Sequence, residues 1–294
     1  MPSLKEVRNR IVSVNSTQQI TKAMKMVSAA KLRRATDAIV QMRPYSQKLT
    51  EMIATVSANA EGAQSNPYTN ARSIQSVLII VVTSDRGLCG AFNANVGKAV
   101  VNLINEKYPS QFEAGKVEIL AIGKKGGEYL SRRGYNVNNQ FVDTFSKLSF
   151  ATVRTAAEFA MNGFVDGKYD VVEVVYNEFK NVATQILKAE QMLPIVEKKD
   201  DQTKKSNVDY IFEPSEEEII SELIPKALKL QVFKAVLESN ASEHGARMTA
   251  MDKATDNAGE LLKELKLIYN RSRQAAITKE ILEIVGGAEA LASA

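Results

Sequence analysis

Apolar residues recur every three or four positions from Leu4 to Met42, which is the spacing of one helix face. Ser3 and Glu6, at the start of this stripe, have the spacing of a capping box, which satisfies free N–H groups at a helix start. Pro44 is expected to end or kink the helix. The pattern predicts a long helix within residues 1–60, in which positions 4 to 42 alone would span about 60 Å.

The pattern changes after residue 75, where short β-branched runs replace the helical stripe. Strand-like runs lie at 77–82, 116–123 and 171–176, and a further edge strand is expected at 184–195. Helical stretches separate them at 94–108, 125–133 and 150–163. Because strands and helices alternate, this segment is predicted to be an α/β unit with a mostly parallel sheet.

Helical spacing returns over residues 215–290. Pro225 is expected to kink the start of this helix, and the pair Gly286-Gly287 is expected to weaken its end. A helix of this length normally needs a partner helix to bury its apolar seam. The first and last segments are therefore predicted to pair with each other.

The seam of the last helix has an unusual middle. Apolar or small residues recur at seam positions from Leu228 to Thr249, and apolar ones resume from Leu261 to Val285. Small and polar residues fill the middle, where a stable coiled coil carries leucine or isoleucine. They either allow a close helix approach or leave the surface free for another contact.

The three segments predict one architecture. The chain runs out along residues 1–60, passes through the α/β segment 74–212 and returns along residues 215–290. The two terminal helices would therefore form an antiparallel coiled coil with an inserted, Rossmann-like α/β domain. The fold class is α/β.

Charge and composition narrow the functions open to this chain. Its 294 residues carry a net charge of +4, which is too mild to indicate a nucleic-acid binder. Residues 1–60 have a net charge of +7 and residues 216–294 a net charge of −3, so the two helices either attract each other or are two solvated faces of unequal charge. The longest clean apolar run, Val77–Val82, is too short to cross a bilayer. Any link to a membrane is expected to pass through another protein.

Candidate catalytic groups are few. A single cysteine, Cys89, and a single histidine, His244, exclude an internal disulfide and a Cys/His zinc site within one chain. Cys89 is either a nucleophile or a small buried thiol, and the second is favoured because no base is evident nearby. His244 is interpreted as a helix-face residue because the sequence gives it no catalytic partners. No acidic cluster has catalytic or metal-binding character, so no catalytic, metal or cofactor residue is predicted.

Two glycine-rich turns follow predicted strands, at 83–93 and 123–127. A turn of this kind can cradle phosphate at a helix start. Neither turn contains the P-loop or dinucleotide-binding pattern. Tight strand-to-helix turns are therefore favoured over a phosphate site.

The first helix carries a basic set and a methionine pair. Its basic residues could face phosphates, but no aromatic residues are interleaved with them, which favours a solvated face or an acidic protein partner. Met24 and Met26 flank Lys25 and belong either to the helix core or to a surface that accepts several packings. The basic residues in question are Arg8, Arg10, Lys22, Lys25, Lys31, Arg33 and Arg34.

Four strings resemble one known family. The segment 20–27, Ile-Thr-Lys-Ala-Met-Lys-Met-Val, resembles the N-terminal signature of the gamma subunit of F-type ATP synthase. The segment 85–93 is similar to its central signature, with Ala91 where glycine is also common. The segments 241–248 and 269–281 are similar to its C-terminal signature. The resemblance covers nearly the whole chain, with the segments in the family's order.

This resemblance implies a rotary central stalk that couples proton flow through the membrane c-ring to ATP synthesis and hydrolysis. The implied partners are a ring of alternating alpha and beta subunits, the epsilon subunit and the c-ring, with no nucleic acid and no membrane insertion. The chain would be a non-catalytic, coupling subunit that binds no cofactor. The implied location is peripheral, on the cytoplasmic face of the bacterial inner membrane.

The resemblance also implies contact residues. Those implied to contact the beta subunit are Met24, Lys25, Arg247, Arg273, Gln274, Thr278 and Glu280. Tyr210 and Glu213 match positions near the c-ring. The photosynthetic form of the family has an inserted cysteine pair for redox switching, which a chain with Cys89 alone does not have.

Two other functions remain open on sequence grounds. One is a small-molecule α/β enzyme with long helical arms, which would show activity as an isolated chain. The other is a coiled-coil adaptor that holds partners in a static, symmetric complex.

Overall fold

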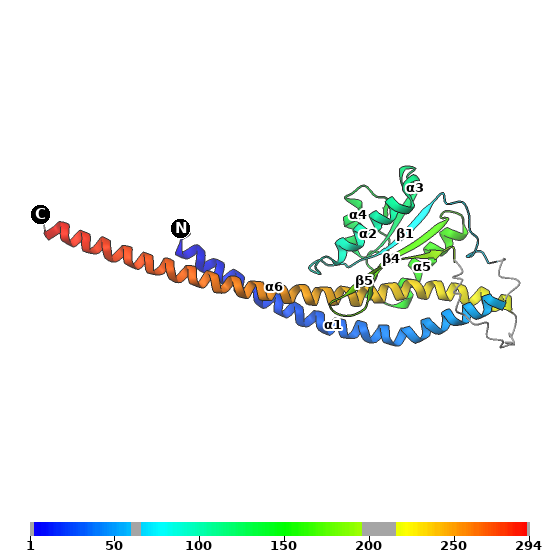
Figure 1. The fold of residues 1–294 in the computed structure, drawn as a ribbon, viewed down its shortest axis with the longest axis horizontal. Helices are drawn as coiled ribbons and strands as arrows, with labels where there is room; N and C mark the ends of the chain where they lie inside the picture. The colour runs from blue at the N-terminus through cyan, green and yellow to red at the C-terminus, as the bar shows by residue number, and fades with distance from the viewer. Residues whose placement is uncertain (1–2, 60–65, 196–215, 293–294) are drawn as a thin grey trace. The chain divides into compact units, whose positions relative to one another are not determined.

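The computed structural model describes residues 3–59, 66–195 and 216–292 (Figure 1). The chain forms two compact units. The first comprises Met1–Ser28 and Met248–Ala294, and the second comprises Ala29–Arg247. Helix α1 (Leu4–Asn59) and helix α6 (Glu216–Ala292) each contribute to both units. The units therefore cut across the predicted segments 1–60, 74–212 and 215–290, because each long helix is shared.

Helix α1 begins at the predicted capping box. The Ser3 amide donates to Glu6 Oε2 at 2.9 Å, and the Glu6 amide donates to Ser3 Oγ at 3.3 Å. Of the two expectations for Pro44, that it ends or kinks the helix, the first is excluded, since α1 continues to Asn59. Proline removes a single N–H group, and buried Met42 and Leu49 hold the turns on either side in the core.

Helix α6 has nearly the predicted bounds, 216–292 against 215–290. Pro225 lies inside it, and buried Ile224 and Leu228 anchor this turn to the core of the α/β domain. The helix also runs through Gly286 and Gly287 to Ala292. The expected weak end at the two glycines is therefore not where the helix stops.

The second unit contains a five-stranded sheet in the order β3-β2-β1-β4-β5. Neighbouring strands are parallel except for β5, which runs antiparallel to β4. The four strands that the sequence predicts are confirmed in position. The bounds are β1 Val77–Val82, β2 Val117–Ile122, β3 Val137–Asn138, β4 Val171–Phe179 and β5 Gln185–Leu193.

Helices connect these strands as predicted, with three short additions. The sequence does not predict β3, α3 or the 3-10 turn η2, because elements of two to five residues are too short to show a period. The helical bounds are α2 Phe92–Lys107, α3 Pro109–Glu113, α4 Lys124–Ser131, η2 Thr144–Lys147 and α5 Phe150–Val165.

Both faces of the sheet are covered, which is why β1 is apolar at every position. Leu78, Ile80 and Val82 pack on one side in a core that also contains α5 and the first half of α6. The alternate residues of β1 pack on the other side with α2. Helix α6 is thus a layer of the α/β domain as well as a partner of α1.

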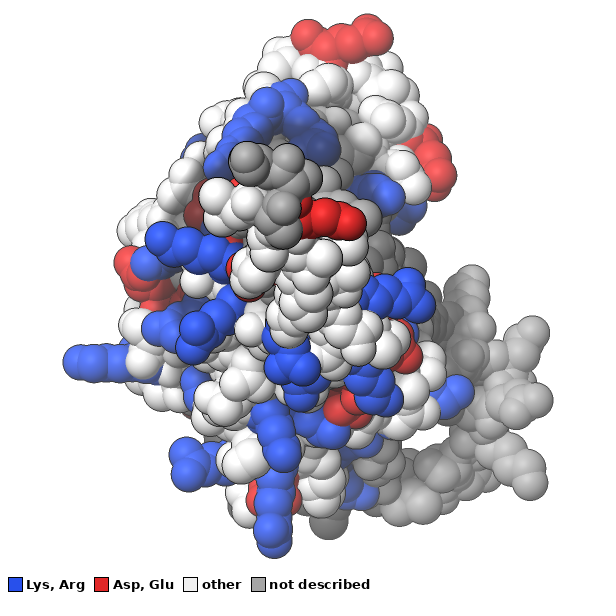
Figure 2. Space-filling view, turned by 90° about the vertical axis from the view of Figure 1, so that its left-hand side faces the viewer, with Lys and Arg blue, Asp and Glu red and all other residues white. Residues whose placement is uncertain are grey.

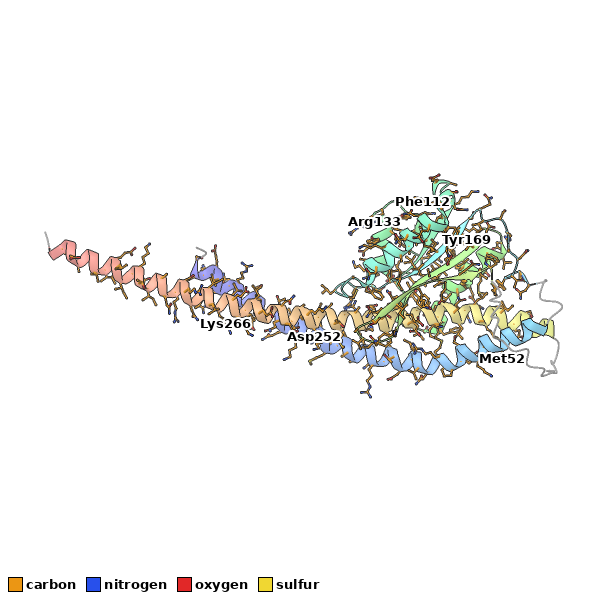
Figure 3. All side chains as sticks on the ribbon, in the orientation of Figure 1. Met52, Phe112, Arg133, Tyr169, Asp252 and Lys266 are labelled. Atoms are coloured by element: carbon orange, nitrogen blue, oxygen red, sulfur yellow. The ribbon has the colours of Figure 1, made fainter. Side chains whose placement is uncertain are left out.

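In the first unit the two long helices are antiparallel. Thr255 Oγ1 donates to Thr21 Oγ1 at 2.8 Å, and Lys25 Nζ pairs with Asp252, which Figure 3 labels on α6, at 2.5 Å. Residue numbers therefore fall along α1 as they rise along α6. The predicted fold class, with antiparallel terminal helices around an inserted α/β domain, is confirmed.

We predict that Gly123→Ala lowers the free energy of unfolding by about 3 kcal/mol. Gly123 has φ +96°, and a Cβ there would overlap the carbonyl of Thr83. Gly134→Ala is the matched control, because its φ is also positive, +83°, but no atom lies within 4 Å of the new Cβ. The control should lose only about 1 kcal/mol. Urea unfolding followed by circular dichroism measures both, and equal losses would contradict the close packing of Gly123 on Thr83.

Candidate functional site

The order of the strands places a potential ligand crevice between β1 and β4. The chain moves from β1 to β2 and β3 on one side, then crosses back to form β4 on the other side of β1. In α/β sheets, ligands bind beyond the carboxyl ends of the strands at such a switch point. The glycine-rich turn 83–93 follows β1 at this edge, so this is where a phosphate site would be sought.

Helix α6 fills this crevice. Ser239 Oγ donates to the carbonyl of Val82, the last residue of β1, at 3.5 Å. Ser242 Oγ donates to the carbonyl of Asn177 in β4 at 3.2 Å. Both serines are buried. At these two positions the small seam residues allow a close helix approach, as the first of the two predicted alternatives requires.

Arg247 holds the turn after β1. Its Nη2 donates to the carbonyl of Arg86 at 2.9 Å and its Nε to that of Gly87 at 3.3 Å. Its Nη1 pairs with Glu243, one turn earlier on α6. The pair is buried, and burial raises the pKa of the Glu243 carboxyl although the neighbouring guanidinium opposes this. Two of the four strings that carry the resemblance, 85–93 and 241–248, therefore meet here.

The turn itself is a closed hydrogen-bonded unit. Asn93 Oδ1 accepts from the Ser84 amide at 3.0 Å, and Asn93 Nδ2 lies 3.2 Å from Cys89 Sγ. Cys89 is buried, and burial raises the pKa of its thiol. The interpretation of Cys89 as a small buried thiol is confirmed.

The second glycine-rich turn, 123–127, is likewise occupied by the chain itself. The Gly126 amide at the start of α4 donates to Thr83 Oγ1 at 2.8 Å. The Lys124 amide lies 3.4 Å from Asp85 Oδ1. Because a hydroxyl and a carboxylate already face these amides, the tight-turn interpretation fits better than a phosphate cradle.

His244 lies half-buried on α6, next to Arg247. Burial and the positive charges of Arg247 and Lys31 lower its pKa to about 4. The ring is therefore neutral near pH 7. Its Nδ1 lies 3.4 Å from Arg247 Nη1, and this placement agrees with the interpretation as a helix-face residue.

The residues predicted to contact beta differ in their exposure to solvent. Arg247 is buried against the turn of its own chain. Met24 is half-buried, and Lys25 is partly exposed while paired with Asp252. Four residues are exposed on α6: Arg273, Gln274, Thr278 and Glu280. The predicted c-ring positions Tyr210 and Glu213 lie outside the described residues.

The end of α6 carries an apolar surface that the sequence analysis did not predict. Counting back from the Thr21–Thr255 contact, Leu4 lies opposite about residue 272, so α1 does not reach the last turns of α6. Leu282 and Val285, expected in a buried seam, are 66% and 55% exposed. The available signal was an apolar stripe at helical spacing that continues beyond the last residue α1 can lie opposite. The exposed set is Ile277, Ile281, Leu282, Ile284, Val285 and Leu291.

Basic side chains are prominent on the outside of the chain. Six of the seven basic residues singled out on α1 are exposed, and the seventh is Lys25. Figure 2 shows one face of the molecule, over which Lys and Arg side chains are spread. No group of three or more potential metal ligands occurs within the described ranges. Among the helices the structure describes, none is long and apolar enough to cross a membrane.

Fold and site together define a class of protein in which two long antiparallel helices carry an α/β domain whose ligand crevice is filled by one of those helices. A family model described as ATP synthase matches residues 3–291. The chain is 63% identical to the ATP synthase gamma chain of Cytophaga hutchinsonii and 56% identical to that of Flavobacterium psychrophilum, each over 99% of both chains. The chain belongs to the ATP synthase gamma-chain family, and the resemblance predicted from its four strings is confirmed.

Two solved structures of ATP synthases contain chains that are similar to this one. The central stalk and c-ring structure of the Tetrahymena thermophila mitochondrial ATP synthase contains a chain that matches with a TM-score of 0.56 and 26% identity, covering 80% of this chain and 99% of that one. A chain of the Euglena gracilis mitochondrial ATP synthase in rotational state 3 matches with a TM-score of 0.65 and 22% identity, covering 98% and 94%. The second match supports the fold alone.

We predict that His244 titrates with a pKa of about 4, against 6.5 for an ordinary histidine. It is the only histidine, so proton NMR can follow its ring directly. Because the unfolded chain binds the proton more readily, the free energy of unfolding should rise with pH from about 4 to 6.5 and fall on acidification through that range. Arg247→Met should move the pKa back toward 6.5. A midpoint near 6.5 in the intact chain would contradict this account.

Proposed function

We propose that this chain is the rotary central-stalk subunit of a proton-transporting ATP synthase. It couples proton flow through the membrane c-ring to ATP synthesis and hydrolysis, and it imposes asymmetry on the catalytic beta subunits. One observation carries the proposal: α6 is a single helix from Glu216 to Ala292 that is hydrogen-bonded to the sheet near its middle and exposes apolar residues at its end. A helix of this kind suits a shaft whose end turns inside other subunits.

The filled crevice supports a non-catalytic role. Ser239, Ser242 and Arg247 occupy the switch point at which an α/β enzyme would bind its substrate. The amides of Lys124 and Gly126, the donors a phosphate would need, face Asp85 and Thr83. We therefore propose that the chain binds no cofactor and that nucleotide is bound by the alpha and beta subunits.

The exposed end of α6 supports a surrounding ring. Six large apolar side chains in water are costly unless another protein covers them. Five of the six fall within about a third of the helix circumference and only Leu282 lies outside it, so they form a stripe that we propose the surrounding alpha and beta subunits cover. Arg273, Gln274, Thr278 and Glu280 lie among them and are proposed to contact beta.

The helix pair offers beta a second contact. In the second unit a cavity of about 680 Å³ is lined by residues of α1 and α6, with apolar Met42 and Phe233 beside basic Lys31 and Arg34. An acidic, partly apolar segment fits this chemistry. We propose that an acidic segment of beta contacts this basic surface. That the acidic lever segment of beta contacts Met24 and Lys25 is a separate proposal, which rests on the family.

The proposal of further partners rests on the family to which the chain belongs. The Tetrahymena structure is described as a central stalk with a c-ring, and the Euglena structure as containing F1 and a c-ring. We propose that this chain likewise contacts the c-ring and the epsilon subunit, with Tyr210 and Glu213 near the c-ring. It would be peripheral on the cytoplasmic face of a bacterial inner membrane, without nucleic acid.

Coupling requires the helix pair to contact each beta subunit differently. A shaft can change the nucleotide affinity of a site only if it interacts differently with the conformations of that site. Because five of the six apolar residues exposed at the end of α6 fall within about a third of its circumference, rotation would present a different surface to each beta subunit in turn. Arg247 would then act by positioning the turn 85–93 rather than by direct contact alone.

Purification of the tagged chain from gently solubilised membranes tests the proposal. Native mass spectrometry should find one copy of this chain with a ring of two P-loop subunits, and the complex should hydrolyse ATP and pump protons. A monomer with enzymatic activity of its own would support the enzyme alternative instead. A symmetric complex in which ATP hydrolysis moves no protons would support the static adaptor.

We predict that Met24→Lys in the whole complex lowers the number of protons pumped per ATP hydrolysed, with little change in assembly. The reason is that a new cation at the proposed lever contact binds the acidic segment too tightly to release it on each turn. Met26→Lys is the matched control, because Met26 is 62% exposed in this chain and tolerates charge there. Equal coupling in Met24→Lys and wild type would remove Met24 from the lever contact.

A further inference from the structure

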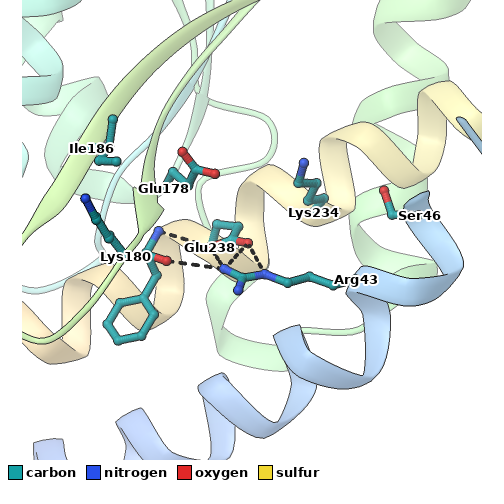
Figure 4. Close-up of a pocket in the computed structure, with 8 residues that line it drawn as sticks. Arg43, Ser46, Glu178, Lys180, Ile186, Lys234 and Glu238 are labelled. Atoms are coloured by element: carbon teal, nitrogen blue, oxygen red, sulfur yellow. Dashed lines mark hydrogen bonds and ion pairs between the residues drawn. The ribbon is translucent and has the colours of Figure 1, made fainter. Parts of the chain in front are cut away.

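Glu238 of α6 joins both long helices to the sheet. Its Oε1 accepts from Arg43 Nη2 of α1 at 3.0 Å and from Arg43 Nε at 3.2 Å. Its Oε2 accepts from the Phe179 amide at the end of β4 at 3.0 Å, and Arg43 Nη2 also donates to the Phe179 carbonyl at 3.3 Å. Figure 4 shows these bonds meeting at one point. We call Arg43, Glu238 and the Phe179 backbone the clasp.

The hydrogen bonds of the clasp depend on direction as well as distance, unlike the apolar contacts of the surrounding core. Glu238 is 1% exposed, so its charge is stable there only while these donors keep their positions. A guanidinium fork offers several N–H donors in one plane, which fixes angles as well as distances. Apolar contacts, by contrast, are non-directional. Sliding or twisting of α1 against α6 and the end of β4 therefore breaks the bonds of the clasp, whereas α6 itself is also held to the sheet by its own buried residues.

Packing on one side of the clasp is open. A cavity of about 470 Å³ lies beside it, lined by Arg43 and Glu238 together with Lys180 of the turn after β4, Ile186 of β5 and Lys234 of α6. The Arg43–Glu238 pair borders this volume and ties α1 to the end of β4 beside it, while buried Ile39 and Met42 of α1 supply apolar packing nearby.

We propose that the clasp transmits torque from the α/β domain, of which α6 is a layer, to α1. This inference rests on the proposed rotary function, in which the α/β domain is driven and the helices act on beta. Arg43 and Glu238 are positioning residues: they keep α1 in fixed register with α6 and the end of β4. Loss of the clasp should leave catalysis intact and let α1 slip against α6 and the domain when the load is high.

The test uses the reconstituted ATP synthase with Arg43→Gln and Glu238→Gln combined. This neutral pair avoids leaving a buried carboxylate without its partner. Lys226→Gln is the matched control, because it removes an exposed ion pair with Glu222 one turn away on the same helix. Protons pumped per ATP hydrolysed are measured in vesicles as the opposing proton gradient is increased.

We expect the neutral pair to hydrolyse ATP at the control rate without a gradient, and to lose pumping as the gradient rises. Arg43→Lys, which keeps the charge but not the fork, should lose less. Equal pumping by the neutral pair and the control at every gradient would overturn the proposal. If Lys226→Gln and wild type also fail to pump, the proposed rotary function itself fails, which is a separate result.

A covalent link separates torque transmission from mere stability. The pair Arg43→Cys and Glu238→Cys, joined by a short bis-maleimide reagent, should pump against the gradient, and the same pair left unlinked should not. Both proteins carry Cys89→Ser, because position 238 is as buried as Cys89 and the reagent would otherwise not distinguish the two thiols. If the neutral pair does not assemble, this linked pair decides the question. Failure of the link to restore pumping in an assembled complex would overturn the proposal.

Discussion

A nearly fully buried carboxylate, that of Glu238, fixes the relation between the two long helices and the sheet. A charge in this position is tolerable only if its donors are present and correctly placed, which ties α1 and β4 to one point on α6. Ser239 and Ser242 then lie directly over the ends of β1 and β4, and Arg247 reaches the next turn. The closed crevice and the position of the turn 85–93 both follow from this seating of α6.

The side chains of α6 differ in kind along the length of the helix. Near its middle, small and polar side chains let the helix approach the sheet closely and bond to strand carbonyls. Further on, Leu262 and Leu265 are buried, and the last turns expose large apolar residues such as Ile284 and Leu291. The small residues of the seam are therefore explained, at Ser239 and Ser242, by contacts within the chain. The apolar end is the part that needs other subunits.

The sequence predicts the elements well and their long-range partners poorly. The all-apolar run Val77–Val82 identifies a strand covered on both faces, and the absence of glycine before Gly62 is consistent with α1 continuing past Pro44 to Asn59. Periodicity cannot reveal that Glu238 accepts a hydrogen bond from Arg43. The two residues lie 195 positions apart, and in the sequence each is indistinguishable from an exposed charged residue. The four resembling strings identify the family, but only the folded chain brings 85–93 and 241–248 together. Elements such as β3, with two residues, carry too little pattern to be found.

Single-molecule rotation tests the central claim most directly. The alpha and beta ring is fixed to a surface, and a probe is attached through Ser110→Cys on α3, an exposed position of the α/β domain. On addition of ATP, the account predicts stepwise rotation of the probe in one direction. A probe that stays fixed while the complex hydrolyses ATP at its normal rate would contradict it.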